Sequence, residues 1–179
     1  SFTQLRQNVI RLANVFKNCG VGKSDKVAIY LPNCPEYAYS YLACFCLGAV
    51  AVPLDYMLTS DELISCLSHS ETKVLIAKEK NEVSFETVKK GAPNLEDVLV
   101  LGSLTAAADS RKLEQCLSYE DLIAKASDKL SPIHMRDRDP ALIMYTSGTT
   151  GKPKGIVLNY KHLDGSPKAM EYFVDLASS

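Results

Sequence analysis

Small, hydroxyl-bearing and basic residues form one continuous run in this sequence, and their types suit the binding of an anion. The run reads Thr146-Ser147-Gly148-Thr149-Thr150-Gly151-Lys152-Pro153-Lys154-Gly155. Its glycines allow sharp turns that bring backbone N–H groups close to an anion, while its hydroxyls and lysines add donors and positive charge. Residues 140–162 contain no Asp or Glu that would repel an anion. The run therefore predicts a loop for polyphosphate oxygens, with each charge-assisted contact contributing about 1.5–3 kcal/mol.

A flexible Gly/Ser/Thr linker is the alternative interpretation of this run. The apolar residues 141–145 precede it and residues 155–158 follow it, and both segments are typical of core strands. A linker between two adjacent buried strands would be unusual, so the flanks favour a strand–loop–strand arrangement. The run also differs from a Walker A loop, because Pro153 follows Lys152 where that loop requires Ser or Thr.

A second candidate for a phosphate loop, Gly22-Lys23-Ser24, is rejected. A Walker A loop needs a glycine five residues before Gly22, and that position is Lys17. Such a loop also follows a strand and precedes a helix, whereas the predicted order here is a helix and then a strand. We interpret the segment as a helix-to-strand turn.

The cysteines and histidines do not form a recognisable metal or catalytic pattern. The sequence contains no C-x-x-C, and no histidine stands at zinc-ligand spacing. A helix start next to Cys34 could lower the pKa of that thiol, but we assign it no catalytic role. We expect free, mostly buried thiols in a reducing cytosol. The histidines are expected to be surface or helix-capping residues: His69, His134 and His162.

The elements that would position the loop alternate between helices and short apolar strands. Apolar residues at helical spacing, capping residues and glycine or proline breaks indicate where each one ends. The predicted helices run from Phe2 toward Gly20, from an Asn33 cap to Leu47, from a Thr59–Glu62 capping box to about Ser70, from Ser84 to Lys90, and from a Ser118 cap to about Ala126. The predicted strands cover residues 27–31, 49–54, 73–77, 97–101 and 141–145, with 155–158 after the loop.

This alternation predicts an α/β fold, a mostly parallel sheet with helices on both faces. Parallel strands need crossover connections, and helices supply them while covering the sheet. Residues 102–112 and 127–140 are polar and are expected to be surface connections. With 179 residues, the chain is one domain or a large piece of one.

The composition excludes several classes of protein. Apolar residues make up 46% and charged residues 23%, which argues against disorder, and the net charge of -1 argues against a protein that binds nucleic acid. The longest apolar run, residues 41–54, is shorter than the roughly 20 residues that a bilayer span needs. No start typical of a signal peptide is present, so we expect a cytoplasmic protein. Ser1 stands where Met is expected, which suggests that the chain was trimmed.

The segment from Tyr145 to Gly155 resembles the signature loop of the adenylate-forming superfamily, the AMP-binding enzymes. Further similar segments follow in the family's order: Leu31-Pro32-Asn33 with Pro35-Glu36, then Gly48-Ala49-Val50-Ala51-Val52-Pro53-Leu54, then Leu58-Thr59-Ser60-Asp61-Glu62-Leu63. The resemblance extends to about Leu163 and is greatest to acyl-CoA synthetases. It implies that the chain is part of the large N-terminal domain of such a fold.

The resemblance implies a two-step reaction. A carboxylic acid, with a fatty acid as the favoured class, attacks ATP with Mg²⁺ to give an acyl-adenylate and pyrophosphate, and CoA then displaces AMP to give a thioester. The residues that would contact ATP are Thr146, Ser147, Gly148, Thr149, Thr150, Gly151 and Lys154, and Thr146 would help to hold Mg²⁺. Lys152 stands at a position that varies in the family and receives a weaker role.

Some features depart from the family pattern. Asn159-Tyr160-Lys161-His162-Leu163 stands where the family often has Thr-His-x-Asn-Leu, and the following Asp164-Gly165-Ser166-Pro167 would interrupt a helix. Family members are also much longer. We therefore expect residues 1–179 to be the N-terminal portion of an AMP-binding domain, with its loop at 146–155, without the C-terminal domain and its catalytic lysine, and inactive alone.

Two other functions remain open at this point. The first is an adenylation domain that loads the thiol of a carrier protein instead of CoA. The second is a non-catalytic nucleotide-binding or scaffolding protein that has kept the loop and lost the rest of the site. In the favoured hypothesis, the binding partners are the carboxylic acid, ATP and CoA. We expect no binding of nucleic acid and no membrane-spanning segment.

Overall fold

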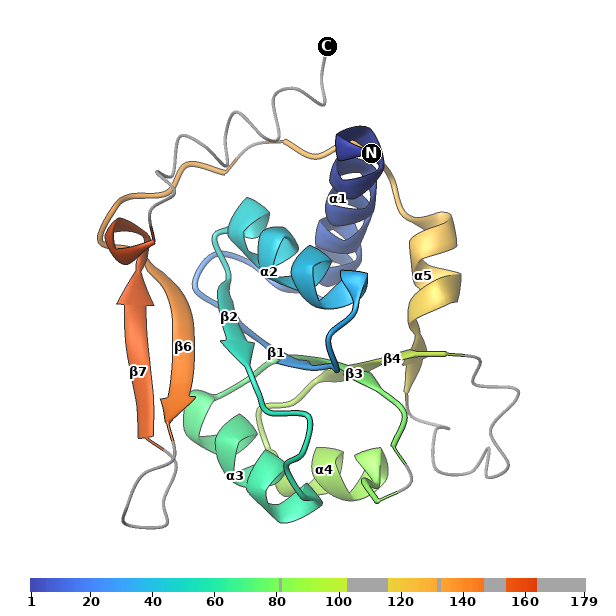
Figure 1. Cartoon of the computed structure of the whole chain (residues 1–179), viewed down its shortest axis with the longest axis vertical. Helices are drawn as coiled ribbons and strands as arrows, with labels where there is room; N and C mark the ends of the chain where they lie inside the picture. Colours follow the sequence, from blue (N-terminus) through green and yellow to red (C-terminus); the bar gives the residue numbers. More distant parts are fainter. Residues whose placement is uncertain (81, 103–115, 132, 147–153, 164–179) are drawn as a thin grey trace.

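The computed structural model describes residues 1–80, 82–102, 116–131, 133–146 and 154–163, and these form a single seven-stranded sheet covered by helices (Figure 1). The strands are β1 (Lys26–Tyr30), β2 (Val50–Pro53), β3 (Val74–Lys78), β4 (Asp97–Leu101), β5 (Leu117–Ser118), β6 (Pro140–Thr146) and β7 (Lys154–Asn159). The helices are α1 (Phe2–Asn18), α2 (Pro35–Leu47), α3 (Ser60–Ser70), α4 (Phe85–Gly91) and α5 (Tyr119–Lys125), with a 3₁₀ turn, η2 (Tyr160–His162).

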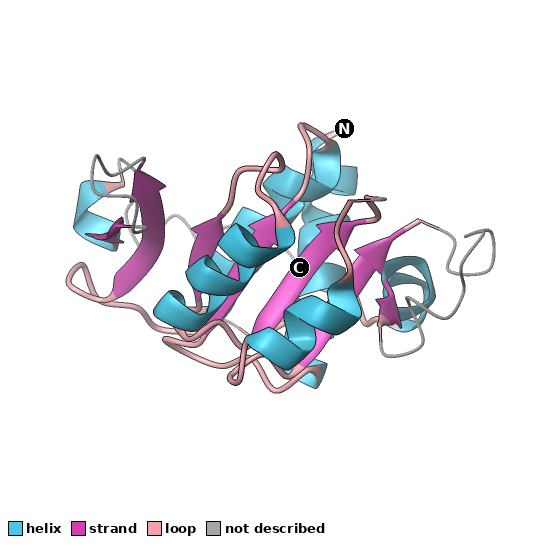
Figure 2. Cartoon of the chain, turned by 90° about the horizontal axis from the view of Figure 1, so that it is seen from below, coloured by secondary structure: helices cyan, strands magenta, loops and turns pink. Residues whose placement is uncertain are grey.

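The sheet is parallel except at one edge. Its strand order is β5-β4-β3-β1-β2-β6-β7, and every neighbouring pair is parallel apart from β6 and β7, which are antiparallel. Figure 2 shows the strands side by side with helices packed across them. The predicted mostly parallel α/β sheet is confirmed.

Helices cover both faces of the sheet, as expected from the alternation of elements. The side chains of β1 alternate between two apolar clusters: Val27 and Ile29 belong to one, Ala28 and Tyr30 to the other. The first cluster includes buried residues of α1 and α2, with α5 packed against it, and the second includes buried residues of α3 and α4. Burial on both faces explains why the central strands are continuously apolar.

The predicted capping box starts α3. Thr59 is the N-cap, and its hydroxyl accepts a hydrogen bond from the Glu62 N–H while the Glu62 carboxylate accepts one from the Thr59 N–H at 2.9 Å. The hydrogen bonds that the Glu62 carboxylate accepts from the Thr59 N–H and from the Thr59 hydroxyl lower the pKa of the Glu62 carboxyl. The helix ends at Glu71, whose φ of 54° is left-handed. The boundaries of α3 are therefore set by local hydrogen bonds that the sequence predicts.

Two details of the predicted elements are wrong. The N-cap of α2 is Cys34 rather than Asn33, because Pro35 takes the first helical position, where its missing N–H carries no cost. The short strand β5 was also not expected, because residues 117–118 carry no strand pattern of their own and pair only by lying beside β4.

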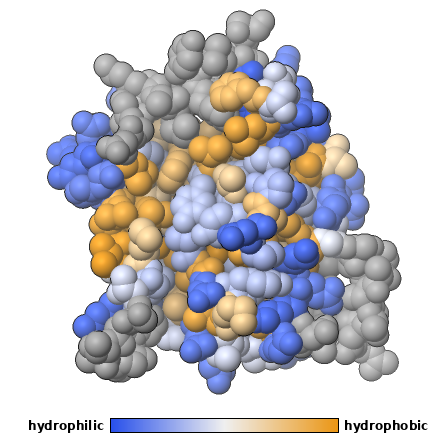
Figure 3. Space-filling view, in the orientation of Figure 1, coloured by the Kyte–Doolittle hydropathy of each residue, from blue (hydrophilic) through white to orange (hydrophobic). Residues whose placement is uncertain are grey.

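Among the described helices, none is both long and apolar enough to cross a lipid bilayer. On the face seen in Figure 3, apolar side chains are exposed over β6 and β7, among other places. On these two strands the exposed large apolar residues are Met144, Ile156 and Val157, and Val157 faces the opposite side of the sheet from Met144 and Ile156. These side chains lie on the strands at the antiparallel edge of the sheet.

We expect Thr59→Ala to loosen α3. Loss of an N-cap side chain costs about 1 kcal/mol, which corresponds to roughly five-fold faster hydrogen exchange of the α3 amides by local opening. Ser65→Ala, an exposed position on the same helix, is the matched control and should leave exchange unchanged or slower. Equal exchange in wild type and Thr59→Ala would show that the cap does not limit the stability of α3.

Candidate functional site

The hairpin of β6 and β7 holds the two ends of the predicted anion-binding loop. Thr146 is paired with Lys154, and Tyr145 is paired with Gly155 on the next step of the ladder. The predicted strand–loop–strand arrangement is thus confirmed at both flanks, but the expectation that residues 155–158 form a buried core strand is wrong, because β7 lies at the edge of the sheet and exposes Ile156 and Val157. The other predicted loop residues lie outside the described part of the chain: Ser147, Gly148, Thr149, Thr150, Gly151, Lys152 and Pro153.

The loop follows the carboxyl end of a parallel strand. β6 is parallel to β2, with Leu142 opposite Ala51, and Thr146 is its last residue. In open α/β sheets, ligands bind outside the carboxyl ends of the strands. The two described ends of the loop, Thr146 and Lys154, therefore lie at the edge of the sheet where a ligand is expected.

The described side chains at the base of the loop suit an anion. Thr146 and Lys154 are both exposed and lie opposite each other. Lys154 makes no ion pair with any residue that the structure describes. Because the two residues lie opposite each other, the Thr146 hydroxyl and the Lys154 ammonium can contact oxygens of the same phosphate group.

The base of the loop is also held by the last turns of α3. The Tyr145 hydroxyl donates to the Cys66 carbonyl at 3.1 Å and lies 2.8 Å from Nδ1 of His69. The two rings meet edge to face, with centroids 5.7 Å apart. Burial raises the pKa of the Tyr145 hydroxyl, which therefore keeps its proton and remains a donor.

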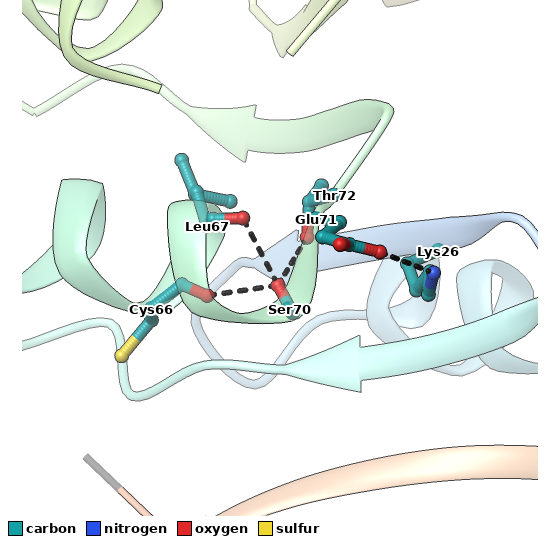
Figure 4. A network of polar contacts seen from close by, with 6 residues as sticks. All are labelled: Lys26, Cys66, Leu67, Ser70, Glu71 and Thr72. Carbon is teal, nitrogen blue, oxygen red and sulfur yellow. Dashed lines mark hydrogen bonds and ion pairs between the residues drawn. The ribbon is translucent and has the colours of Figure 1, made fainter. Parts of the chain in front are cut away.

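The α3 turn that receives Tyr145 is itself a hydrogen-bonded network (Figure 4). The buried Ser70 hydroxyl lies 2.8 Å from the Cys66 carbonyl, 3.2 Å from the Leu67 carbonyl and 2.7 Å from the Thr72 hydroxyl. Thr72 is fully buried. Such a network fixes the carbonyl that Tyr145 contacts.

Gly155 has little free space beside it. A Cβ atom at this position would lie 3.0 Å from Cγ2 of Ile143, 3.5 Å from the Tyr145 ring and 3.6 Å from His69. The first distance is shorter than an ordinary van der Waals contact. The absence of a Cβ at Gly155 therefore favours the close approach of β7 to Tyr145 and α3.

The other candidates from the sequence are explained by structural contacts. Lys23 of the rejected Gly22-Lys23-Ser24 segment forms an ion pair with Asp139 at 2.6 Å, so its charge is compensated. His162 caps η2, since its Nδ1 accepts from the Asn159 N–H at 3.1 Å. Among the described residues, no group of His, Cys, Asp or Glu could hold a metal ion.

The expectation that a helix start could lower the pKa of Cys34 is wrong. Burial raises the pKa of this thiol, because desolvation outweighs the hydrogen bonds from backbone N–H groups at the start of α2. Burial also raises the pKa of the Cys66 and Cys116 thiols to about 11. All six cysteines are free, as predicted, and three of them are buried, Cys44, Cys46 and Cys66, while the other three are partly buried.

The sequence did not indicate the contact between His69 and Tyr145. His69 is exposed in the last turn of α3, as expected of a surface histidine, yet it has a partner 76 positions away in the chain. No spacing rule connects two residues that meet only because α3 and β6 pack together. The only signal was that Tyr145 directly precedes the predicted loop.

The amino-acid sequence of this chain is similar to those of known proteins. The family model described as AMP-binding enzyme matches residues 1–171. An acetyl-coenzyme A synthetase of Methylobacterium radiotolerans is 32% identical over 167 residues, covering 88% of this chain and 26% of that protein. A crotonobetaine/carnitine–CoA ligase of Salmonella paratyphi A is 30% identical, covering 91% of this chain and 31% of that protein.

Solved structures with a similar fold are also known. The anthranilate CoA ligase AuaEII, crystallised with anthranoyl-AMP, superposes with a TM-score of 0.79 at 27% identity, covering 89% of this chain and 29% of that chain. The N-terminal domain of FACL13 from Mycobacterium tuberculosis has a TM-score of 0.71 at 29% identity, covering 88% of this chain and 37% of that chain. The chain thus spans about a quarter to a third of the curated relatives' length.

We expect Gly155→Ala to destabilise the hairpin. The added methyl group must push Ile143 aside, and such overpacking typically costs about 1–3 kcal/mol. The measurement is the midpoint of thermal unfolding, which should fall. Gly22→Ala is the matched control, since its Cβ would meet nothing closer than Asp25 at 3.8 Å. An equal, small change in both variants would contradict the close packing described here.

Proposed function

Because the chain belongs to the AMP-binding enzyme family, we propose that its loop 146–155 holds the β- and γ-phosphates of ATP in an acid–thiol ligase. The observation that carries this proposal is the hairpin base, where Thr146 and Lys154 lie opposite each other at the carboxyl end of β6. The loop that joins them contains glycines, hydroxyls and a second lysine, and no acidic residue. This combination suits a polyphosphate better than a neutral ligand.

The first step of the proposed reaction is adenylate formation. A carboxylate oxygen of the acid attacks the α-phosphorus of ATP, and the bond from that phosphorus to the bridging oxygen breaks, so that pyrophosphate leaves. Negative charge builds up on the departing pyrophosphate. Loop N–H groups, hydroxyls and Lys154 would stabilise this charge, and positioned donors of this kind are a major source of rate enhancement.

The second step transfers the acyl group to a thiol. The CoA sulfur attacks the carbonyl carbon of the acyl-adenylate and AMP leaves with the electron pair of its bond to that carbon. The loop has already released its phosphates and takes no direct part. The anthranoyl-AMP bound in the structurally similar anthranilate CoA ligase is an acyl-adenylate of the kind that this scheme requires.

Magnesium fits the proposed site as a companion of ATP. Mg²⁺ prefers oxygen ligands and often takes most of them from substrate phosphates and water. The exposed Thr146 hydroxyl at the hairpin base is a suitable oxygen donor, and the described residues contain no carboxylate cluster that would bind the ion on its own. When bound, the ion would neutralise part of the phosphate charge.

The proposal names a carboxylic acid as the substrate class and CoA as the acceptor. The relatives' names refer to acetyl, crotonobetaine or carnitine, and anthranilate groups, so they support an acid in general rather than a fatty acid. All of them name CoA, which favours CoA over a carrier protein. The free thiols agree with a reducing compartment such as the cytoplasm.

Residues 1–179 would supply the phosphate loop and nothing that we assign to the acid or to CoA. We therefore propose that this stretch does not complete the reaction alone. Acid-dependent ATP consumption by purified residues 1–179 would contradict that statement.

The decisive experiment is acid-dependent ATP–pyrophosphate exchange by the full-length gene product that contains these residues. Short, medium, long and aromatic carboxylic acids would be tested with Mg²⁺. Exchange with a subset of acids supports adenylation and identifies the acid class. Thioester formation with a carrier protein but not with CoA would favour the carrier-loading function. The absence of exchange from folded protein would favour a non-catalytic nucleotide-binding role.

We expect Lys154→Ala to slow adenylate formation and to affect thioester formation less, because the loop stabilises pyrophosphate only in the first step. Loss of a charge-assisted contact of about 1.5–3 kcal/mol corresponds to a roughly 10- to 150-fold slower first step. The two half-reactions would be measured separately, the second from preformed acyl-adenylate. Lys161→Ala, an exposed lysine beyond the opposite end of β7, is the control. Equal losses in both half-reactions would indicate a structural role for Lys154.

A further inference from the structure

We propose that the last turns of α3 act as a clamp on the base of the loop, and that His69 and Tyr145 are positioning residues for adenylate formation. The α3 clamp consists of Cys66 and His69 on α3, with Tyr145 and Gly155 on the hairpin. This inference rests on the proposed function and adds to it residues that lie outside the loop. Neither His69 nor Cys66 belongs to the segment that suggested phosphate binding.

The clamp contacts one end of the loop and lies close to the other. Tyr145 directly precedes Thr146, and its hydroxyl contacts Cys66 and His69. Gly155 directly follows Lys154 and leaves just enough room for the Tyr145 ring and His69 to approach it. In Figure 1 the end of α3 lies beside the ends of β6 and β7 from which the loop extends. A single helical turn thus holds the residue before Thr146 by hydrogen bonds and lies close to the residue after Lys154.

One arrangement of donors and acceptors satisfies both contacts of the Tyr145 hydroxyl. Because the Tyr145 O–H donates to the Cys66 carbonyl, the Tyr145 oxygen is left to accept from His69. The Nδ1 atom of His69 is therefore the nitrogen that carries the proton in this contact. An Asn side chain places its amide N–H close to the position of an Nδ1–H, so His69→Asn can preserve the donor while removing the imidazole ring.

The clamp is anchored to the centre of the sheet. The Ser70 hydroxyl contacts the same Cys66 carbonyl that receives Tyr145, and it also contacts the buried Thr72 (Figure 4). Glu71 forms an ion pair with Lys26 of β1 at 3.2 Å. Thr72 lies two residues before the start of β3, which is paired with β1. The position of Tyr145 is thereby linked to β1 and β3, whose residues are mostly buried.

Anchoring of this kind affects the rate more than the binding of substrate. Loop donors must already point to where charge develops in the transition state, and a displacement of about 1 Å can cost on the order of 100-fold in rate. Contacts that matter only in the transition state change kcat, whereas contacts made equally with the ground state change KM. Loss of the clamp is therefore expected to lower kcat of adenylate formation.

The test compares Tyr145→Phe, His69→Ala and His69→Asn in the full-length gene product. We expect the first two variants to lower kcat of ATP–pyrophosphate exchange about ten-fold, with KM for the acid and the rate of thioester formation from preformed acyl-adenylate unchanged. His69→Asn should recover most of the rate, because it restores the donor. Ser65→Ala, exposed on the same helix and outside the clamp, should behave as wild type.

Several outcomes would contradict the proposed role of the α3 clamp. One is a kcat within two-fold of wild type in both Tyr145→Phe and His69→Ala. Another is an equal loss in both half-reactions together with a lower unfolding midpoint, which would mean a structural role only. Failure of wild-type protein to exchange pyrophosphate with any acid would instead count against the proposed function. In that case hydrogen exchange of residues 143–146 and 155–157 tests the clamp alone, and equal protection in Tyr145→Phe and wild type would refute it.

Discussion

Burial of the central strands on both faces is the constraint on which the rest of this structure depends. β1 is enclosed between one apolar cluster shared with α1 and α2 and another shared with α3 and α4. Parallel strands cannot be joined by tight turns, so each connection must cross the sheet and cover it. The same requirement fixes where α3 lies and therefore which side chains its last turn presents to β6.

The antiparallel hairpin of β6 and β7 is the exception to this pattern, and the proposed function depends on it. A hairpin brings the two ends of a loop together without a crossing helix, so Thr146 and Lys154 can act on one ligand. The hairpin also lies at an edge of the sheet, where it has fewer neighbours to restrain it. The α3 clamp supplies restraint at this edge through the Tyr145 hydroxyl, while Gly155 allows the close approach.

The sequence-based predictions failed for two kinds of reason. Some depended on a contact between distant parts of the chain, and others on two opposing effects at the same residue or on neighbouring residues. β5 forms because residues 117–118 lie beside β4, and two residues carry no strand pattern of their own. At Cys34 the helix start favours the thiolate, but burial disfavours it more strongly, and the extent of burial depends on packing. Choosing Asn33 as the cap overlooked the preference of Pro35 for the first helical position.

The sequence by itself determined the α/β class, most element boundaries and the strand–loop–strand setting of residues 146–155. Those features follow from local causes: the spacing of apolar residues, capping hydrogen bonds such as that of Thr59, and glycines with left-handed backbones such as Gly48. Only the tertiary structure decided that β7 is antiparallel to β6 and that His69 meets Tyr145. Pairings of this kind depend on how whole helices and strands pack across the sheet, and no spacing along the chain encodes the distance between two side chains that packing brings together.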